Sequence, residues 1–132
     1  MSVFEISPAP YGMRIAYKGF PTPEDVAAMT GDIQRIIAPL APGWGVLVDM
    51  RHNKAFSAES AEMMKQQIET CKRAGMQRAA VVLQSAIMAL QARRISSETG
   101  IIPFIRFIDA GSDPAWEQAA TAWITRGTEP AG

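Results

Sequence analysis

The sequence predicts a single α/β domain built on a mixed, mostly parallel sheet. Apolar runs of strand length alternate with longer segments in which apolar residues recur every three or four positions, and no repeat or linker interrupts the 132 residues. Strands that alternate with helices imply right-handed crossovers and therefore parallel pairing. The predicted order is β-β-α-β-α-β-α-β-α. We expect one α/β domain over residues 1–127 and a flexible C-terminal tail over 128–132.

Composition narrows the class of protein. Apolar residues make up 48% of the chain, and 13 basic residues balance 13 acidic ones, so the basic surplus typical of nucleic-acid binding is absent. The single cysteine excludes an intramolecular disulfide and suits a reducing compartment. No apolar run approaches the roughly 20 residues that cross a bilayer, and the start has no signal-peptide pattern. We expect a cytoplasmic protein with no nucleic-acid partner and no membrane insertion.

Residues 1–7 and 12–19 are predicted to form a hairpin. In the second segment, Met13, Ile15 and Tyr17 alternate with Arg14, Ala16 and Lys18, which is the period of a half-buried strand. The intervening segment, 8–12, contains two prolines that have no N–H to donate to a ladder. It is therefore the turn.

A helix is predicted to begin after Thr22. Thr22 is suited to cap the free N–H groups, Pro23 to the first helical position, and the acidic side chains of Glu24 and Asp25 to the positive end of the helix dipole. Gly31 weakens the middle of this helix by about 1 kcal/mol relative to alanine. Prolines end it, and its apolar stripe is Val26, Met29, Ile33, Ile36 and Leu40.

Residues 44–50 are apolar on both faces, as in a central parallel strand that helices cover on both sides. A helix follows, with Ser57 as its N-cap and Gly75 closing it in the left-handed conformation. Residues 78–84 form another buried strand, a helix occupies about 85–99, and the last strand covers 104–109.

The final helix is predicted to have Ser112 or Asp113 as its cap and Pro114 in its first turn. Its inner face carries two tryptophans seven residues apart and small or β-branched residues between them. This face consists of Trp116, Ala119, Ala120, Trp123 and Ile124.

Short patterns in this order resemble the STAS fold (sulphate transporter and anti-sigma factor antagonist), and more narrowly its SpoIIAA-like branch. They are Gly-Phe-Pro-Thr-Pro-Glu-Asp at 19–25, Val-Leu-Val-Asp-Met at 46–50, Arg-Ala-Ala-Val-Val at 78–82 and Phe-Ile-Asp at 107–109. The resemblance covers nearly the whole chain. It implies the architecture of small bacterial proteins related to anti-anti-sigma factors.

In anti-anti-sigma factors a phosphorylatable serine lies in an Asp-Ser-Ser-Gly motif after the central strand. This chain has no such motif, and Ser57, in Phe-Ser-Ala-Glu-Ser, is the nearest positional counterpart. Phosphate at a helix N-terminus would be compatible with the dipole and would change the surface charge. An ordinary N-cap explains Ser57 equally simply, and the sequence favours the cap over the phosphosite.

Polar side chains follow three of the predicted strands. Ligands of open α/β sheets bind beyond the carboxyl ends of the strands, so a ligand- or partner-binding rim is expected there. No zinc ligand set, calcium loop or phosphate-binding glycine loop is present, so no metal and no cofactor are expected. The predicted rim consists of Asp49, Arg51, His52, Ser57, Gln84, Ser85 and Asp109.

Three functions remain open. The favoured one is a non-enzymatic regulatory or protein-interaction domain, expected to form a homodimer through the helix around Met88, Gln91 and Ile95. The second is a protein that binds an apolar or anionic small molecule in a pocket between helices. The third is a minimal hydrolase with Ser57 or Ser85 as nucleophile and His52 as base, although no Gly-x-Ser-x-Gly elbow surrounds either serine.

Overall fold

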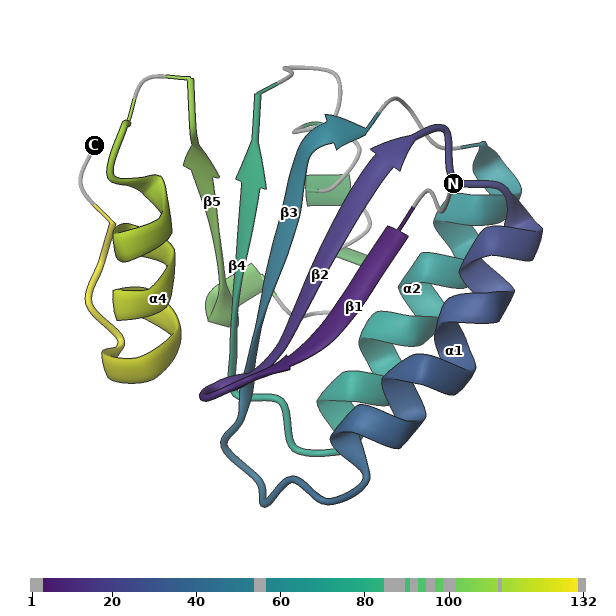
Figure 1. Cartoon of the computed structure of the whole chain (residues 1–132), viewed down its shortest axis with the longest axis horizontal. Helices are drawn as coiled ribbons and strands as arrows, with labels where there is room; N and C mark the ends of the chain where they lie inside the picture. Colours follow the sequence, from purple (N-terminus) through teal and green to yellow (C-terminus); the bar gives the residue numbers. More distant parts are fainter. Residues whose placement is uncertain are drawn as a thin grey trace.

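The fold is that of a three-layer α/β domain. The computed structural model describes residues 4–53, 57–84, 90, 93–94, 97–98, 102–111 and 113–130. One sheet has five strands in the order β1-β2-β3-β4-β5, with helices α1 and α2 on one face and α4 on the other (Figure 1). The strands are β1 (Phe4–Ala9), β2 (Gly12–Gly19), β3 (Gly45–Asn53), β4 (Arg78–Leu83) and β5 (Ile105–Asp109).

Pairing within the sheet confirms the predicted mixed, mostly parallel arrangement. β1 runs antiparallel to β2, whereas β2, β3, β4 and β5 pair in parallel with their neighbours. The helices are α1 (Pro23–Ile37), α2 (Ala58–Arg73) and α4 (Trp116–Arg126), and a short 3-10 helix, η1 (Ile102–Phe104), precedes β5. The helix predicted over 85–99 lies mostly outside the described residues. No helix in the described part of the chain is long and apolar enough to cross a membrane.

Side-chain caps begin α1 and α2 as predicted. The Thr22 hydroxyl accepts a hydrogen bond from the Asp25 N–H, and the Asp25 carboxylate accepts one from the Thr22 N–H, which completes a capping box. At α2, the Ser57 hydroxyl oxygen accepts the Ser60 N–H. Gly75 ends this helix with a φ of +108°, and a Cβ there would lie 2.9 Å from Pro42, so the position favours glycine on two grounds.

The start of α4 differs from the sequence prediction. The helix begins at Trp116, and Ala115 occupies the N-cap position without a side-chain hydrogen bond. Asp113 accepts the Ala115 N–H at 2.9 Å in a turn that precedes the helix, so the prediction that Asp113 is the cap is wrong. Aspartate side chains favour such local turns in competition with capping. Ser112 is outside the described residues.

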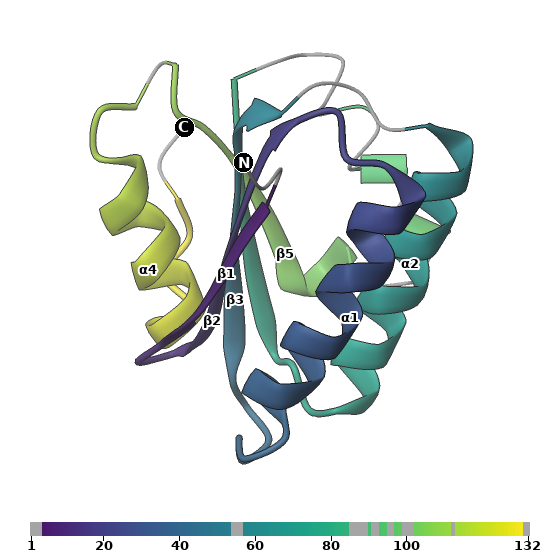
Figure 2. The same cartoon turned by 45° about the vertical axis from the view of Figure 1, so that its right-hand side comes forward.

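Both faces of the sheet are buried, as the apolar β3 and β4 require. Figure 2 shows the sheet edge-on, with the α1–α2 layer on one side and α4 on the other. The core under α4 is smaller and includes Leu47, Val82, Trp123 and Ile124. The larger core lies under α1 and α2 and includes Ile15, Val26, Met29, Val46, Val81 and Ile105.

Candidate functional site

The carboxyl ends of the parallel strands and the N-termini of α1 and α2 lie at one end of the molecule (Figure 1). The register places Asp49 beside Val82, and Leu83 beside Asp109, so the predicted rim residues of β3 and β5 belong to the same end of the sheet. Ser57 is at the same end because it caps α2. Ser85 lies outside the described residues.

A β-bulge shapes the end of β3. Ala16 of β2 faces Asp49, but Lys18 faces His52, so β3 carries one additional residue over this interval. Within the bulge Asp49 accepts the Arg51 backbone N–H at 3.1 Å and two guanidinium bonds of 2.9 Å each. Bulges often redirect side chains beside functional sites, and here the bulge lets two residues of one strand form a bidentate ion pair. The sequence does not show this extra residue.

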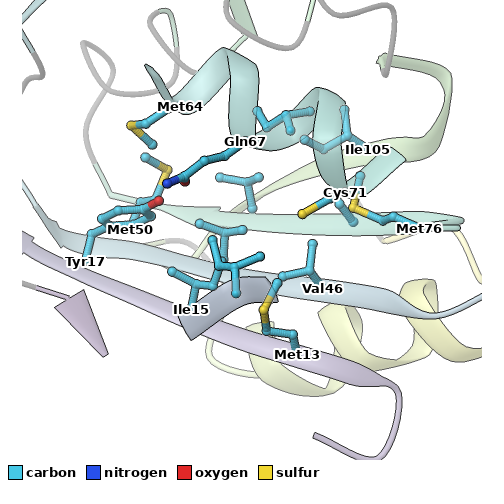
Figure 3. Close-up of a pocket in the computed structure, with 15 residues that line it drawn as sticks. Met13, Ile15, Tyr17, Val46, Met50, Met64, Gln67, Cys71, Met76 and Ile105 are labelled. Atoms are coloured by element: carbon cyan, nitrogen blue, oxygen red, sulfur yellow. The ribbon is translucent and has the colours of Figure 1, made fainter. Parts of the chain in front are cut away.

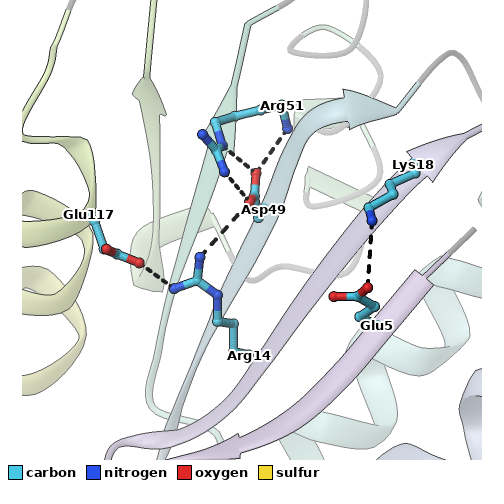
Figure 4. Close-up of polar contacts among 6 residues, drawn as sticks. All are labelled: Glu5, Arg14, Lys18, Asp49, Arg51 and Glu117. Atoms are coloured by element: carbon cyan, nitrogen blue, oxygen red, sulfur yellow. Dashed lines mark hydrogen bonds and ion pairs between the residues drawn. The ribbon is translucent and has the colours of Figure 1, made fainter.

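The ion pair extends across the α4 face of the sheet. Arg14 of β2 lies between Asp49, 4.0 Å away, and Glu117 of α4, 2.6 Å away (Figure 4). The Arg51 guanidinium lies over the Trp116 ring, 4.3 Å from its centroid. The rim pair therefore also connects β2 and β3 to the first turn of α4, a connection that the sequence did not predict.

Electrostatics favour the charged form of Asp49. The side chain is almost completely buried, and burial alone would raise its pKa, but hydrogen bonds from Arg51 and the charges of Arg51 and Arg14 lower the pKa below its usual value. Asp49 is therefore a carboxylate already satisfied by arginines. It is unsuited to act as a general base and is better suited to hold Arg51 in place.

Of the two serines in the hydrolase hypothesis, Ser57 is described by the structure and Ser85 is not. The Ser57 hydroxyl donates to the Ser60 hydroxyl at 3.1 Å and accepts the Ser60 N–H, while His52 makes no hydrogen bond to it. Activation of a serine requires a base within hydrogen-bond reach. His52 and Ser57 are both exposed, so they are available to a partner instead.

The N-terminus of α2 is tied to the loop before α1. The completely buried Ser60 hydroxyl donates to the Pro21 carbonyl at 3.1 Å, which continues the contact that begins at Ser57. Next to Pro21, the Phe20 side chain is 66% exposed. Neither Phe20 nor Ser60 was among the residues predicted from the sequence. An aromatic residue directly after a strand and before a proline-rich helix start was the available signal for Phe20.

Asp109 ends β5 and is exposed. Its carboxylate accepts the Gly111 N–H at 2.8 Å, which stabilises the turn after the strand. Within the described residues, no three histidine, cysteine or acidic side chains are grouped so as to hold a metal ion. The rim thus combines a rigid ion pair with exposed side chains of mixed chemistry.

A second feature lies away from the rim. A cavity of about 80 Å³ separates the sheet from α2, and its walls are almost entirely apolar. Figure 3 shows side chains from β2, β3 and α2 directed into it, with Tyr17 and Gln67 at the same end. The sequence showed many methionines but not which of them share a cavity. The four that line it are Met13, Met50, Met64 and Met76.

Comparisons with known proteins inform the fold. No protein-family model matches this chain, and no curated protein matches it either. A crystal structure of an uncharacterised protein from Shewanella loihica PV-4, of the DUF3478 family and with a SpoIIAA-like fold, aligns with a TM-score of 0.65 and 18% sequence identity. The alignment covers 92% of this chain and 91% of that protein. The chain accordingly has a SpoIIAA-like fold.

Proposed function

We propose that this chain is a non-enzymatic regulatory or protein-interaction domain whose partner binds at the carboxyl-end rim. The observation that carries the proposal is that two exposed residues, Phe20 after β2 and Ser57 at the start of α2, belong to segments joined by the hydrogen bonds from Ser57 to Ser60 and from Ser60 to Pro21. Aromatic side chains surrounded by polar groups are typical of interaction sites.

The chemistry of the rim supports binding rather than catalysis. Its buried carboxylate is neutralised by Arg51 and Arg14, and its serine hydroxyl is engaged by Ser60. A rigid charged pair beside exposed polar side chains can orient a partner without a reacting group. Phosphorylation of Ser57 would remove the hydroxyl hydrogen now donated to Ser60 and add negative charge at this surface. Such a change would regulate binding at the rim.

The test compares two exposed phenylalanines at opposite ends of the sheet. Phe20 is 66% exposed after β2, and Phe104 is 46% exposed just before β5. Immobilised Phe20→Ser protein is expected to lose the host proteins that wild type retains, because truncation removes the aromatic contact. Phe104→Ser protein is expected to retain them. Mass spectrometry of the three eluates would read the result, and equal retention by both variants would contradict the proposal.

The rim is also expected to respond to charge at position 57. Ser57→Asp keeps a helix-capping side chain but adds a negative charge, whereas Ser57→Asn keeps the cap without charge. If the rim is a regulated surface, Ser57→Asp should weaken retention of the same host proteins several-fold relative to Ser57→Asn. If both variants retain the host proteins equally, Ser57 acts only as a helix cap, and the regulatory part of the proposal is wrong.

We also propose that the protein is a homodimer. Two-fold dimers are the commonest soluble assembly, and Leu90, in the segment expected to pair, is 68% exposed. Light scattering coupled to size exclusion is expected to give twice the chain mass of 14.3 kDa. Leu90→Ser should shift the mass toward that of one chain. A wild-type mass of one chain at high protein concentration would remove the dimer from the proposal.

A further inference from the structure

We propose that the cavity between α2 and the sheet is a binding site for a small, uncharged, mostly apolar molecule that carries one hydroxyl group. This site is separate from the rim and does not depend on the function proposed there. It realises the second class of function that the sequence left open.

The size of the cavity is the first argument. Protein interiors are packed about as densely as organic crystals and leave few voids larger than a water molecule. This one measures about 80 Å³, several times the space that one water needs, and apolar cavities of this kind stay dry and take up small rings. This apolar pocket between α2 and the sheet is therefore a natural place for a guest.

The walls are adaptable. Methionine has three rotatable bonds and a polarisable sulfur, so it conforms to guests of different shape. The four methionines come from β2, β3, α2 and the turn after α2, so they surround the cavity instead of lining one side of it (Figure 3). A guest somewhat larger than the present void can enter through their rearrangement.

The hydrogen-bonding state of Gln67 defines the polar end of the ligand. Its side-chain nitrogen donates to the Val26 carbonyl at 2.7 Å and to the Thr30 hydroxyl at 3.1 Å, which uses both of its hydrogens. Among the described residues nothing donates to its side-chain oxygen. That oxygen is an acceptor, so the complementary ligand group is a donor, and a hydroxyl group is the simplest.

The remaining polar groups exclude charged ligands. Burial raises the pKa of the Tyr17 phenol, with a smaller contribution from Cys71, and burial raises the pKa of the Cys71 thiol to about 11. Both side chains are neutral at physiological pH. An ion that entered would lose its hydration without gaining an opposite charge, which is strongly unfavourable.

A second opening lies next to the cavity. A crevice of about 130 Å³ lies between α1 and α2, and it shares Ile33 and Gln67 with the cavity. These two side chains therefore form the wall between the crevice and the cavity. The described residues that line the crevice are all uncharged, namely Thr30, Ile33, Gln34, Gln66, Gln67 and Thr70.

The experiment titrates the full chain, labelled with ¹³C at the methionine methyls, with phenol. Saturable shifts are expected at the methyl groups that line the cavity, and much smaller ones at Met29 and Met63, which do not line it. Shifts of equal size at all methionines, or no saturable shift at millimolar phenol, would overturn the proposal.

Two variants make the test specific. Ala79 lines the cavity on β4, and Ala79→Val should weaken phenol binding at least tenfold by filling the space. Ala16→Val adds the same atoms to the opposite face of the sheet, where side chains alternate away from Ile15, and should leave binding unchanged. Circular dichroism would confirm that both variants fold. Equal binding by Ala79→Val and wild type would place the phenol elsewhere.

The role of Gln67 is read from a ratio. Toluene matches phenol in size but has no hydroxyl. The ratio of the toluene Kd to the phenol Kd should therefore be about three- to tenfold larger for wild type than for Gln67→Leu, as expected for one hydrogen bond. If this ratio is the same in both proteins, the hydroxyl requirement is wrong.

Discussion

The Asp49 carboxylate is the residue on which the rim depends most. It is 5% exposed, and three hydrogen bonds from Arg51 and a more distant contact with Arg14 offset the cost of burying it. Asp49→Asn replaces an acceptor-only group by one that also donates, so it removes the carboxylate that pairs directly with Arg51. We expect a loss of about 1–3 kcal/mol in the free energy of unfolding, measured by urea denaturation at pH 7.

The same residue predicts a pH dependence. The folded-state pKa of Asp49 is lowered, so its contribution to stability is fully present above the unfolded pKa of about 3.9 and is lost as the pH falls through the folded value. Below about pH 4 the stability of wild type should therefore fall more steeply than that of Asp49→Asn. Glu62→Gln, at an exposed carboxylate 4.0 Å from Lys65, is the control and should follow wild type. Parallel curves for wild type and Asp49→Asn would refute the assignment.

Individual site residues were predictable from the sequence to different degrees. Asp49 and Arg51 were placed at the rim because they follow an apolar run, and the structure puts them there. Their pairing depends on a bulge that sets β3 out of register with β2, and nothing in the local sequence marks the extra residue. The partners Arg14 and Glu117 are 103 residues apart, so only the tertiary fold brings them together.

At the scale of elements, the cap of α2 allows a direct test. Ser57 accepts the Ser60 N–H, so Ser57→Ala should destabilise the protein by about 1 kcal/mol, and Ser57→Asp should restore most of the loss. The measurement is the midpoint of urea unfolding at a constant slope. If Ser57→Asp loses as much stability as Ser57→Ala, the Ser57 hydroxyl contributes mainly through its hydrogen bond to Ser60, which in turn bonds Pro21, and less as a helix cap.

The approach of α4 to the sheet depends on Gly45 in β3. A Cβ at this position would lie 2.4 Å from a methyl group of Ile124 and 2.8 Å from the Arg78 carbonyl, so Gly45→Ala should cost about 1–3 kcal/mol by overpacking. Gly31 in α1 has nothing within 4 Å, so Gly31→Ala should stabilise by about 0.5–1 kcal/mol. Thermal unfolding of the two variants should shift in opposite directions. A destabilised Gly31→Ala would contradict this view of α1.

Helix ends show what sequence patterns can and cannot determine. Thr22 and Ser57 were predicted correctly because a cap, an acidic first turn and an apolar stripe coincided. The same signals coincided at α4, where Asp113 precedes Pro114 and the acidic Glu117, but the Asp113 side chain closes a preceding turn instead. Agreement among local signals therefore does not decide a helix start where one side chain has two local hydrogen-bonding options.

At the scale of the whole molecule, the layered architecture was predictable because apolar alternation determines which faces are buried. The cavity could not be predicted from the sequence. It exists because side chains from β2, β3, β4, β5 and α2 leave space between them, and that depends on tertiary packing. Filling it should stabilise the protein. Ala79→Val is expected to raise the free energy of unfolding by up to about 2 kcal/mol, from the cost of an empty volume of about 80 Å³. A decrease would indicate that the walls have already collapsed.

The central functional claim is that partners bind at the carboxyl end of the sheet. The most direct measurement is photocrosslinking in the native host from a benzoylphenylalanine placed at position 20, compared with the same probe at position 104. We expect a discrete protein adduct from position 20 that position 104 does not give. An adduct from position 104 alone, or identical products from both, would place the interacting surface at the other end of the molecule or nowhere specific.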